Sequence, residues 1–528
     1  MTRLKLVAAA VAAIWASAAF AQSGPVEVSP AVRQDTLHSL RDVVPDQAKY
    51  RQMRPRYEHD LPLPHVPDNQ RDGAIQGFSA PSLNTPSLGT AVLGLGKGFT
   101  GPNGSFTVQY APPDTTGAVG ATQFVQVVNT GLAVFDKATK AVTYGPVPTS
   151  TLWSGFGGGC ETNNDGDATV VYDKVANRWV ISQFSVSTTP YLQCVAVSTS
   201  SDATGTYNRY AFSYGNTAFP DYPKTGVWPD GYYTTFNIFN GNSFGGAKLC
   251  AYDRTAMLAG GAATQQCFQL STSYGGVLPA DVDGATQPPA GAPNYMMNFG
   301  SNSLNLWKFH VNWATPASST LTGPTSIPVA AFAAACGGGT CIPQAGVSQK
   351  LDSLADRLMF RLAYRNRSGV ESLLVSHSVN PNGSTKNPKS QSAAVRWYEI
   401  RTPNTPTVFQ QGTYAPDATY RWMPSIAMDK VGDIAVGYSA SSSSITPAIR
   451  YAGRVPTDAA GTLQAEVTLQ AGGGSQTGSN LARWGDYSAM TLDPVDDCTF
   501  WFTTEYLTAN GAFNWSTRIG SFKFPSCN

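Results

Sequence analysis

Residues 483–494 read RWGDYSAMTLDP, and residues 495–502 continue as VDDCTFWF. The same phrase recurs upstream in degenerate form, as RWMPSIAMD at residues 421–429, KVGD at 430–433 and IAVGYS at 434–439. Each copy combines a short β-rich run, an aspartate-initiated turn and a second β-rich run, which predicts a hairpin. This repeated hairpin is a strong indication of the fold class. No catalytic motif in the chain indicates an activity as clearly.

Further units of the same kind extend the pattern. They lie at residues 124–136, 168–184, 225–237, 294–311 and 357–377. The units follow one another at roughly 50 to 70 residues, at or above the length of a propeller blade with four short strands. The sequence therefore predicts an all-β chain that forms a β-propeller of six or seven blades, with a large β-sandwich or jelly roll as the alternative. We expect the last strand, residues 516–524, to join a blade begun near the N-terminus.

Residues 1–21 have the features of a secretory signal peptide. Arg3 and Lys5 precede an apolar run from Leu6 to Trp15, and an A-x-A cleavage site follows at residues 19–21. That run is too short to span a membrane, and no later stretch approaches the roughly 20 apolar residues that a span needs. We expect a secreted or periplasmic protein without a membrane span.

The residues that follow divide into two parts. Residues 22–100 contain proline-rich and charged stretches without a period, which predicts an irregular N-terminal extension, a propeptide or a linker. Residues 101–528 consist of strands and turns almost throughout and form the predicted propeller.

The composition favours strands and excludes some partners. Charged residues make up 13% of the chain, against about 25% in an average soluble domain. Aromatic residues make up 11%, and there are 51 glycines, which favours strands and turns. A net charge of +1 gives no reason to expect a nucleic-acid partner. We expect a monomer.

The chain has eight cysteines, an even number that predicts disulfides in an exported protein. Sequence alone does not fix how they pair. Pairing between neighbours is the simplest hypothesis, and it gives the bonds Cys160–Cys194, Cys250–Cys267, Cys336–Cys341 and Cys498–Cys527.

Several short segments resemble a widespread family of exported bacterial proteins. They are Asp165–Asp167, Trp228–Tyr233, Arg396–Glu399, Arg421–Trp422 and Arg483–Tyr487, and the likeness covers nearly all of residues 110 to 528. The resemblance implies an architecture and export, without an established activity. More loosely, the chain is similar to the sialidase-type propeller superfamily, but it has no intact Asp-box, so the catalytic residues of sialidases cannot be assigned by motif.

The propeller prediction also indicates where a ligand would bind. The innermost strand of each blade lines the central channel, so residues at the start of each such strand gather around the channel mouth. Arginines there could grip carboxylates, and aromatic rings could stack on sugar faces. The candidate ligand-binding residues are Tyr222, Arg361, Arg421, Trp422, Arg483 and Trp484. Salt bridges and packing between blades are the alternative role for each of them.

The residue inventory narrows the possible chemistry. The predicted propeller contains two histidines, which argues against a three-histidine zinc site, and no nucleophile elbow, P-loop or HExxH motif is present. Carboxylate chemistry remains, with Asp167, Asp486 and Glu505 as candidates for glycoside hydrolysis. His377 with Tyr364 is the candidate pair for a lyase. Packing in the core or at the surface is the alternative for a single histidine on a strand.

One segment could hold a metal ion. Residues 161–167 read ETNNDGD, with oxygen-bearing side chains around a glycine turn, which suits Ca²⁺. Asp165 and Asp167 are the predicted ligands. Because the segment lacks a full EF-hand loop, a plain turn rich in Asx residues is the alternative.

Two functions remain open at this point. The first is an exported β-propeller that binds a glycan, a protein or another extracellular ligand at its channel mouth, with no activity assigned. The second is a carbohydrate-active hydrolase or lyase that uses carboxylates at the same mouth.

Overall fold

The chain folds almost entirely into strands and turns. The computed structural model describes residues 24–52, 60–67, 69–81, 84–384, 387, 390–479 and 481–528. Strands make up 48% of the chain and helices 6%, which confirms the all-β prediction. The expected signal peptide at residues 1–21 lies outside the described residues.

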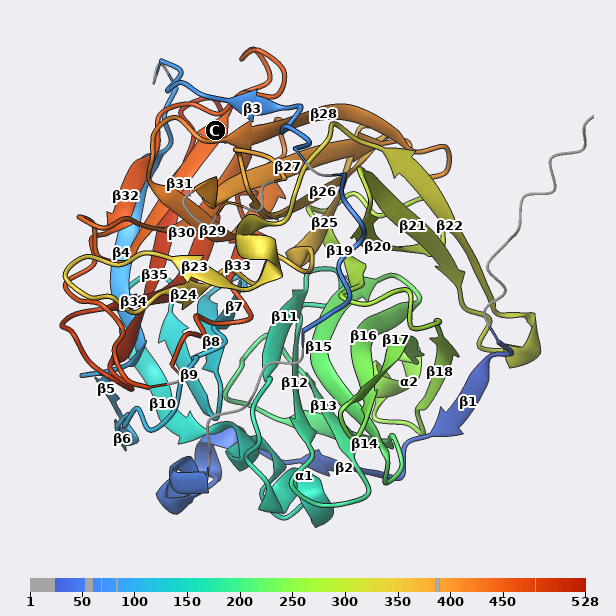
Figure 1. Ribbon diagram of the computed structural model, residues 1–528. Coiled ribbons are helices and arrows are strands. Elements are labelled where there is room, and N and C mark those ends of the chain that lie inside the picture. The colour runs from blue at the N-terminus through green and yellow to red at the C-terminus, as the bar shows by residue number, and fades with distance from the viewer. Residues whose placement is uncertain are drawn as a thin grey trace, which may run out of the picture.

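The strands form a series of four-stranded antiparallel units in chain order (Figure 1). The first unit contains β7 (Thr116–Val119), β8 (Gln123–Val128), β9 (Gly131–Asp136) and β10 (Val142–Pro148). The second contains β11 (Thr169–Asp173), β12 (Arg178–Ser185), β13 (Leu192–Ser198) and β14 (Tyr207–Ser213). The third contains β15 (Ala218–Trp228), β16 (Gly231–Asn240), β17 (Ser243–Tyr252) and β18 (Thr264–Gln269).

The series continues to the C-terminus. The fourth unit contains β19 (Leu278–Asp283), β20 (Asn294–Gly300), β21 (Ser303–His310) and β22 (Thr320–Pro328). The fifth contains β25 (Met359–Arg367), β26 (Val370–Val379), β27 (Ala394–Arg401) and β28 (Thr407–Tyr414). The sixth contains β29 (Tyr420–Met428), β30 (Ile434–Ser441), β31 (Ala448–Arg454) and β32 (Val467–Gln470). The last contains β33 (Ala489–Leu492), β34 (Phe500–Leu507) and β35 (Trp515–Lys523).

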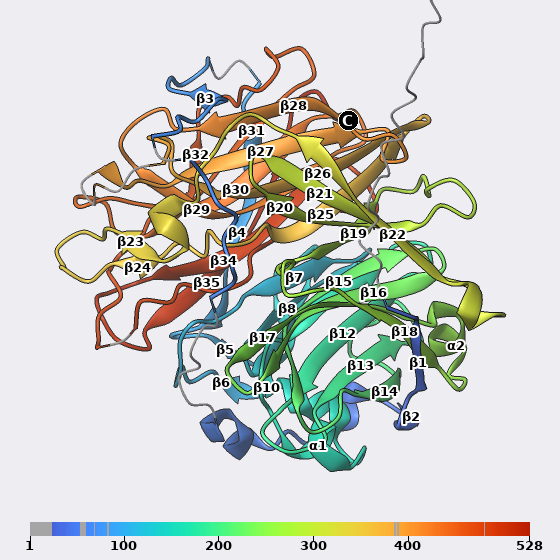
Figure 2. The same ribbon diagram turned by 45° about the vertical axis from the view of Figure 1, so that its right-hand side comes forward.

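The first strands of successive units lie against one another. β7 contacts β11, β11 contacts β15, β15 contacts β19, and β19 pairs in parallel with β25. β25 contacts β29, β29 contacts β33, and β33 contacts β7. Figures 1 and 2 show the units following one another around the molecule, from the cyan β7–β10 through green to the red β33–β35. The starts of these seven strands therefore come close together.

Residues from the N-terminal region complete four of the sheets. Four strands add to outer edges: β1 (Glu27–Pro30) to β18, β2 (Arg33–Leu37) to β14, β3 (Ile75–Gln76) to β28 and β4 (Ser87–Gly96) to β35. β4 supplies the fourth strand of the last unit, so the first and last parts of the chain share one sheet. This pairing confirms that the last strand joins a segment near the N-terminus.

The remaining elements are short. Two further strand pairs are β5 (Thr100–Gly101) with β6 (Gly104–Ser105) and β23 (Thr340–Ile342) with β24 (Leu351–Asp352). The helices are η1 (Leu40–Asp42), η2 (Gln47–Gln52), η3 (Thr149–Trp153), α1 (Gly158–Thr162), α2 (Arg254–Ala259), η4 (Pro316–Ser318) and η5 (Ala335–Gly338). No described helix is long and apolar enough to cross a membrane. Residues 329–358, between β22 and β25, form an insertion that carries η5, β23 and β24.

The aspartates of the repeated phrase form its turns. Asp429 Oδ1 accepts hydrogen bonds from the backbone N–H groups of Val431, Gly432 and Asp433, at 3.0, 2.9 and 2.9 Å. In the later copy, Asp493 Oδ1 accepts from Val495 N–H at 3.0 Å. A side chain that satisfies several backbone donors fixes the turn between two strands. The predicted hairpins, β29–β30 and β33–β34, are both present.

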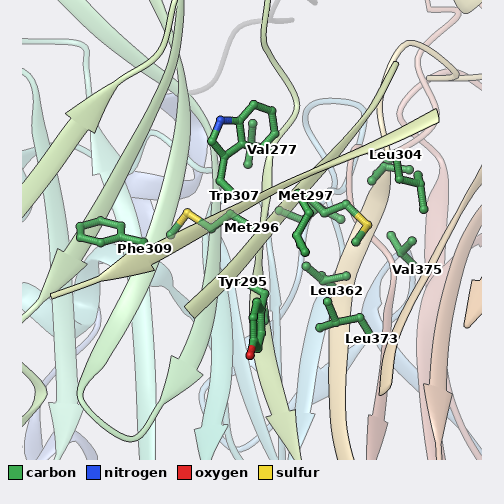
Figure 3. Close-up of a cluster of buried hydrophobic side chains, with 14 of the residues drawn as sticks. Val277, Tyr295, Met296, Met297, Leu304, Trp307, Phe309, Leu362, Leu373 and Val375 are labelled. Atoms are coloured by element: carbon green, nitrogen blue, oxygen red, sulfur yellow. The ribbon is translucent and has the colours of Figure 1, made fainter. Parts of the chain in front are cut away.

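Each sheet buries both faces against its neighbours, and β20 illustrates this (Figure 3). Alternate side chains of a strand point to opposite faces. Met297 lies beside Leu362 and Val375 of the fifth unit, whereas Met296 lies with Trp307 and Phe309. All of these side chains are almost fully buried. Stacking of sheets thus buries both faces of a strand, which explains why the strands are apolar on both faces.

All four disulfides predicted from neighbour pairing are present. Cys160–Cys194 ties α1 to β13, and Cys250–Cys267 links adjacent β17 and β18. Cys336–Cys341 closes a small loop in the insertion, and Cys498–Cys527 ties the C-terminus to the start of β34. No cysteine is left free, as is typical of proteins from oxidising compartments.

Candidate functional site

An unusual backbone conformation recurs where the chain leads into the first strands. Asp114, Asp167, Tyr222, Met423 and Gly485 all have positive φ, between 41° and 58°, and four of the five are not glycine. They precede or interrupt β7, β11, β15, β29 and β33. Non-glycine residues adopt this region rarely, and they persist there when surrounding contacts hold them. The same end of several units is therefore held in a strained conformation.

These segments bring together a group of charged and aromatic side chains, which we call the acid–base cluster. It contains Asp114, Asp167, Lys224, Asp486 and Glu505, with Tyr222, Tyr487, Arg357 and Arg483 around them. Asp114 Oδ1 accepts from the Asp486 backbone N–H at 2.7 Å, and Arg483 pairs with Asp486. The Tyr487 hydroxyl donates to the Pro223 carbonyl at 3.0 Å and lies 3.4 Å from Asp167 Oδ2.

Lys224 is the most unusual member of the cluster. It is fully buried, and its Nζ lies 3.0 Å from the ring centroids of both Tyr222 and Tyr487. Among the described residues, Nζ has no hydrogen-bond partner. Burial lowers the pKa of Lys224 well below its usual value, although the charges of Asp167, Asp486 and Asp114 oppose this shift.

The carboxyl groups of the cluster have pKa values shifted in opposite directions. Burial, with the nearby charges of Asp114 and Asp486, raises the pKa of Glu505 well above its usual value. Burial also acts to raise the pKa of Asp486, but the guanidinium groups of Arg483 and Arg357 hold it below its usual value. Both oxygens of Glu505 lack a hydrogen-bond partner in the described part of the chain. Neighbouring carboxyl groups in such different states are typical of functional sites.

The structure brings together the three carboxylates predicted for hydrolysis, but buries them. Asp167, Asp486 and Glu505 are 6%, 8% and 2% exposed. Tyr487 contacts Asp167 directly, and the charges of Asp486 and Glu505 interact. Because the three carboxyl groups are buried, a bulky substrate cannot reach them in this conformation. Hydrolysis requires two carboxyl groups that face the scissile bond.

The lyase pair predicted from sequence does not form. His377 is fully buried, and its Nε2 lies 3.0 Å from the Tyr398 hydroxyl. Tyr364 donates instead to Glu371 at 2.6 Å. Burial, together with the charge of Arg396, lowers the pKa of His377 well below its usual value. His377 lies against Phe299 and Phe332, so it belongs to the core.

Two arginines predicted to bind ligand are held by ion pairs. Arg361 Nε donates to Asp281 at 2.7 Å, and its Nη2 lies 2.7 Å from Asp283. Arg421 donates to Glu466 through Nε and Nη2, at 2.9 and 2.8 Å. Their side chains are 1% and 0% exposed, so neither lines an open surface. Arg361 links the neighbouring strands β25 and β19, whereas Arg421 reaches from β29 to the segment before β32.

The predicted aromatic residues are also buried. Trp422 and Trp484 pack against each other with ring centroids 6.0 Å apart, and Tyr222 belongs to the same apolar cluster. Leu351, Leu354 and other residues of the insertion complete that cluster. The insertion therefore covers the two tryptophans, which the repeat pattern could not reveal. Of the predicted ligand-binding residues, Arg483 and Tyr222 contact the acid–base cluster.

The predicted Ca²⁺ ligands have other roles. Asp165 Oδ2 accepts from the backbone N–H groups of Val186 and Ser187, at 2.6 and 2.7 Å. The Asp167 backbone N–H donates to Asn129 at 2.8 Å. Within the described ranges, no group of three or more histidine, cysteine, aspartate or glutamate side chains is arranged to hold a metal ion. The contacts of the segment instead tie it to distant parts of the chain around Asn129 and Val186.

A pocket opens beside the acid–base cluster, with a volume of about 330 Å³. Its lining includes Tyr274, Asn298, Asn305 and Arg357. Asn305 Nδ2 donates to Asn298 Oδ1 at 3.0 Å, and the Arg357 guanidinium lies 4.6 Å from the centroid of the Tyr222 ring. The pocket therefore reaches the cluster through Arg357. The sequence reading did not single out Asn298 or Asn305, because a single polar residue on a strand carries no motif.

Comparisons with known proteins give limited likenesses. No family model and no curated protein sequence match this chain. Among solved structures, the WD40 domain of SCAP from fission yeast is 8% identical, with 77% of this chain and 82% of that chain covered and a TM-score of 0.32. An exo-β-1,3-galactanase from Clostridium thermocellum is 11% identical, over 78% and 91%, with a TM-score of 0.29. An ulvan lyase is 10% identical, over 82% and 80%, with a TM-score of 0.27. These values are too low to transfer an activity.

Proposed function

We propose that this protein is an exported, monomeric β-propeller of seven blades that binds a glycan at its channel mouth. The contacts of β33 with both β29 and β7, and the pairing of β4 with β35, support a closed ring of seven units. Closure leaves only short edges and gives each sheet two neighbours. The four disulfides support a secreted or periplasmic location, because such bonds persist in oxidising compartments.

The pocket beside the acid–base cluster is the observation that supports a glycan as the ligand. Its volume of about 330 Å³ lies within the usual range for small-ligand sites, about 300 to 1,000 Å³. The half-buried amide of Asn305 can pair with sugar hydroxyls, and Tyr274 offers an aromatic face. Asn298 positions Asn305, because its Oδ1 accepts from Asn305 and its Nδ2 donates to the Gly275 carbonyl. At the inner wall, Arg357 donates to both oxygens of Asp356, at 2.6 and 2.9 Å, so the two charges offset each other. Together these groups suit a polyhydroxylated ligand.

A hydrolase is the second candidate, and one observation favours it. The pKa of Glu505 is raised and that of Asp486 is lowered, which would suit a general acid beside a carboxylate base. The burial of both groups disfavours this reading, because substrate would need the cluster to open. We therefore rank binding without cleavage above hydrolysis.

A polysaccharide panel separates the two functions. The purified protein is screened for retention of neutral, uronate-containing and sulfated polysaccharides, and the same samples are assayed for release of reducing ends. Retention without cleavage supports the binding function. Cleavage that disappears in Glu505→Gln supports the hydrolase, whereas an absence of both retention and cleavage contradicts both functions.

A further inference from the structure

A short N-terminal segment runs over the pocket. Residues 60–67 form an extended stretch without regular structure (Figure 1, the blue ribbon between β3 and the middle of the molecule). Leu61 is 6% exposed, and its backbone N–H donates to the carboxylate of Asp356 at 2.8 Å. Leu63 is 38% exposed. Leu61 is thus the anchor of a segment that is otherwise open to solvent, which we call the strap (residues 61–66).

The surface below the strap is shaped to receive Leu61. A Cβ added at Gly275 would lie 3.1 Å from Leu61 Cδ2, and one added at Gly276 would lie 3.2 Å from Leu61 Cδ1. The same atom at Gly276 would lie only 2.7 Å from Arg357 Cβ. Two consecutive glycines therefore form a notch that any side chain would narrow. Leu61 sits in this notch directly beside Arg357.

The strap also divides the surface into two pockets. One is the pocket of about 330 Å³ described above, and the other has a volume of about 180 Å³. Both are lined by Leu63, Pro64, Phe299 and Gly300. Because two strap residues line both pockets, the strap is the partition between them. Without it, the two pockets would merge into one groove.

A continuous column of side chains leads from the strap into the protein. Leu61 lies beside Arg357, Arg357 lies over one ring of the tyrosine pair, and Lys224 lies over that same Tyr222 ring. At the inner end, Lys224 Nζ is buried without a hydrogen-bond partner in the described part of the chain. Buried polar groups are normally satisfied, so unsatisfied ones mark a place where a polar ligand or water belongs.

We propose that the strap occupies the ligand groove as a displaceable cover. This inference rests on the proposed function and adds the control of the site. When Leu61 leaves its notch, the two pockets join and the Arg357–Asp356 ion pair is uncovered.

Few contacts hold the strap, which makes its release feasible. Besides the Leu61–Asp356 hydrogen bond, the carbonyl oxygen of His65 accepts from Ser301 Oγ at 2.7 Å. Neighbouring strands, in contrast, are joined by complete hydrogen-bond ladders. Segments with few buried contacts open at much lower free energy than the core of the same protein. The strap is therefore the part of this face best suited to move.

A peptide experiment tests the strap directly. In the full-length Leu61→Asp variant, a carboxylate replaces the apolar side chain in the glycine notch, beside an Arg357 that Asp356 already pairs, and burying this charge should be costly enough to expel the strap. A fluorescent peptide with the sequence of residues 60–66, DLPLPHV, is then titrated into the variant and into the natural protein. We expect at least about tenfold tighter binding to the variant, because the natural protein keeps the groove filled. The same peptide with aspartate in place of its first leucine should not bind.

The controls keep the test decisive. Val44→Asp introduces the same charge at an N-terminal valine that is 88% exposed, and it should leave peptide binding as weak as in the natural protein. If Leu61→Asp does not fold, hydrogen exchange of the natural protein replaces it: the Leu61 amide should exchange at least about tenfold faster than the amide of Ile426 in β29. Equal peptide binding to the folded variant and the natural protein, or equal protection of the two amides, would overturn the proposal.

The same samples separate this proposal from the proposed function. Polysaccharide retention that increases in Leu61→Asp supports both. Equal retention by the variant and the natural protein, with no peptide binding, supports the glycan function and rejects the strap. Peptide binding without retention of any polysaccharide supports the strap and rejects the glycan ligand.

Discussion

Two buried groups of charges lie along the first strands, and they differ in how completely their charges are paired. Around Arg361, the guanidinium contacts Asp281 and Asp283 and donates to the Met490 carbonyl at 2.9 Å, while Lys174 pairs with Asp283. Arg361 Nη2 and Asp283 Oδ2 lack an aligned hydrogen bond but lie 2.7 Å apart as an ion pair. Around Lys224, the amine and the Glu505 carboxyl have neither a hydrogen bond nor an ion pair among the described residues. The first group has the arrangement of a structural link between sheets. The second retains unsatisfied groups, as a binding site does.

Incomplete pairing of buried charges indicates the candidate functional region of this fold. A complete ion-pair network stabilises the arrangement that it joins, and removing one member leaves charges uncompensated. An incomplete network keeps hydrogen-bonding capacity for a ligand. Residue type alone does not separate the two, since each contains carboxylates and a cation.

Removal of Arg361 should have the largest effect on stability. Arg361→Leu leaves the buried Asp281 and Asp283 without their main partner, so we expect the free energy of unfolding to fall by about 3 to 5 kcal/mol. Guanidinium chloride denaturation followed by tryptophan fluorescence measures this. A loss below about 1 kcal/mol would show that the ion pairs around Arg361 are not an important structural link between the sheets.

Glu505→Gln should change how stability depends on pH. The folded-state pKa of Glu505 is raised by burial, so the folded protein keeps this proton above pH 4.5, where the unfolded chain releases it. The stabilisation is complete below the unfolded pKa and is lost as pH rises, by up to about 1.4 kcal/mol per pH unit. We expect Glu505→Gln to be more stable than the natural protein at pH 8 and to show a flatter profile between pH 5 and 8. Urea denaturation at several pH values measures both, and parallel profiles would contradict the assignment.

Lys224→Met should have the smallest effect on stability. The amine has no hydrogen-bond partner to lose, and methionine keeps a similar length against the rings of Tyr222 and Tyr487. We expect a change within about 1 kcal/mol, because replacing an unsatisfied buried polar group by an apolar one is close to neutral. The same denaturation assay provides the comparison with Arg361→Leu. A loss as large as that of Arg361→Leu would erase the contrast between the two groups.

Local chemistry explains what the sequence predicts well. Asp429 and Asp493 satisfy the backbone donors of their own turns, so the hairpins can be read from a few neighbouring residues. Adjacent strands can bring together in space two cysteines that are also close in sequence, as for Cys250 and Cys267. Pairing of neighbouring cysteines therefore predicts the disulfides. The gathering of Asp167 and Asp486 follows from placing the strand starts together, and Glu505 joins them because the end of β34 lies opposite the start of β33.

The features that sequence reasoning missed depend on contacts between distant segments. Trp422 and Trp484 are covered by an insertion whose position no repeat encodes. The strap meets Asp356 and the Gly275–Gly276 notch about 200 to 300 residues further along the chain, and no short motif joins them. Arg361 and Arg421 look like ligand-binding arginines until their partners Asp283 and Glu466 are placed. Burial and pairing, which decide the role of each charge, come only from the folded arrangement.

The affinity of the pocket for the polysaccharide that the panel retains, measured by isothermal titration calorimetry, tests the proposed binding site most directly. Asn305→Ala removes an amide from the half-buried lining of the pocket, and Asn177→Ala removes one from the exposed turn between β11 and β12. We expect Asn305→Ala to weaken binding about tenfold or more, because one or two hydrogen bonds are lost, and Asn177→Ala to leave it unchanged. Equal affinities for the natural protein and Asn305→Ala would contradict the assignment of the ligand to this pocket.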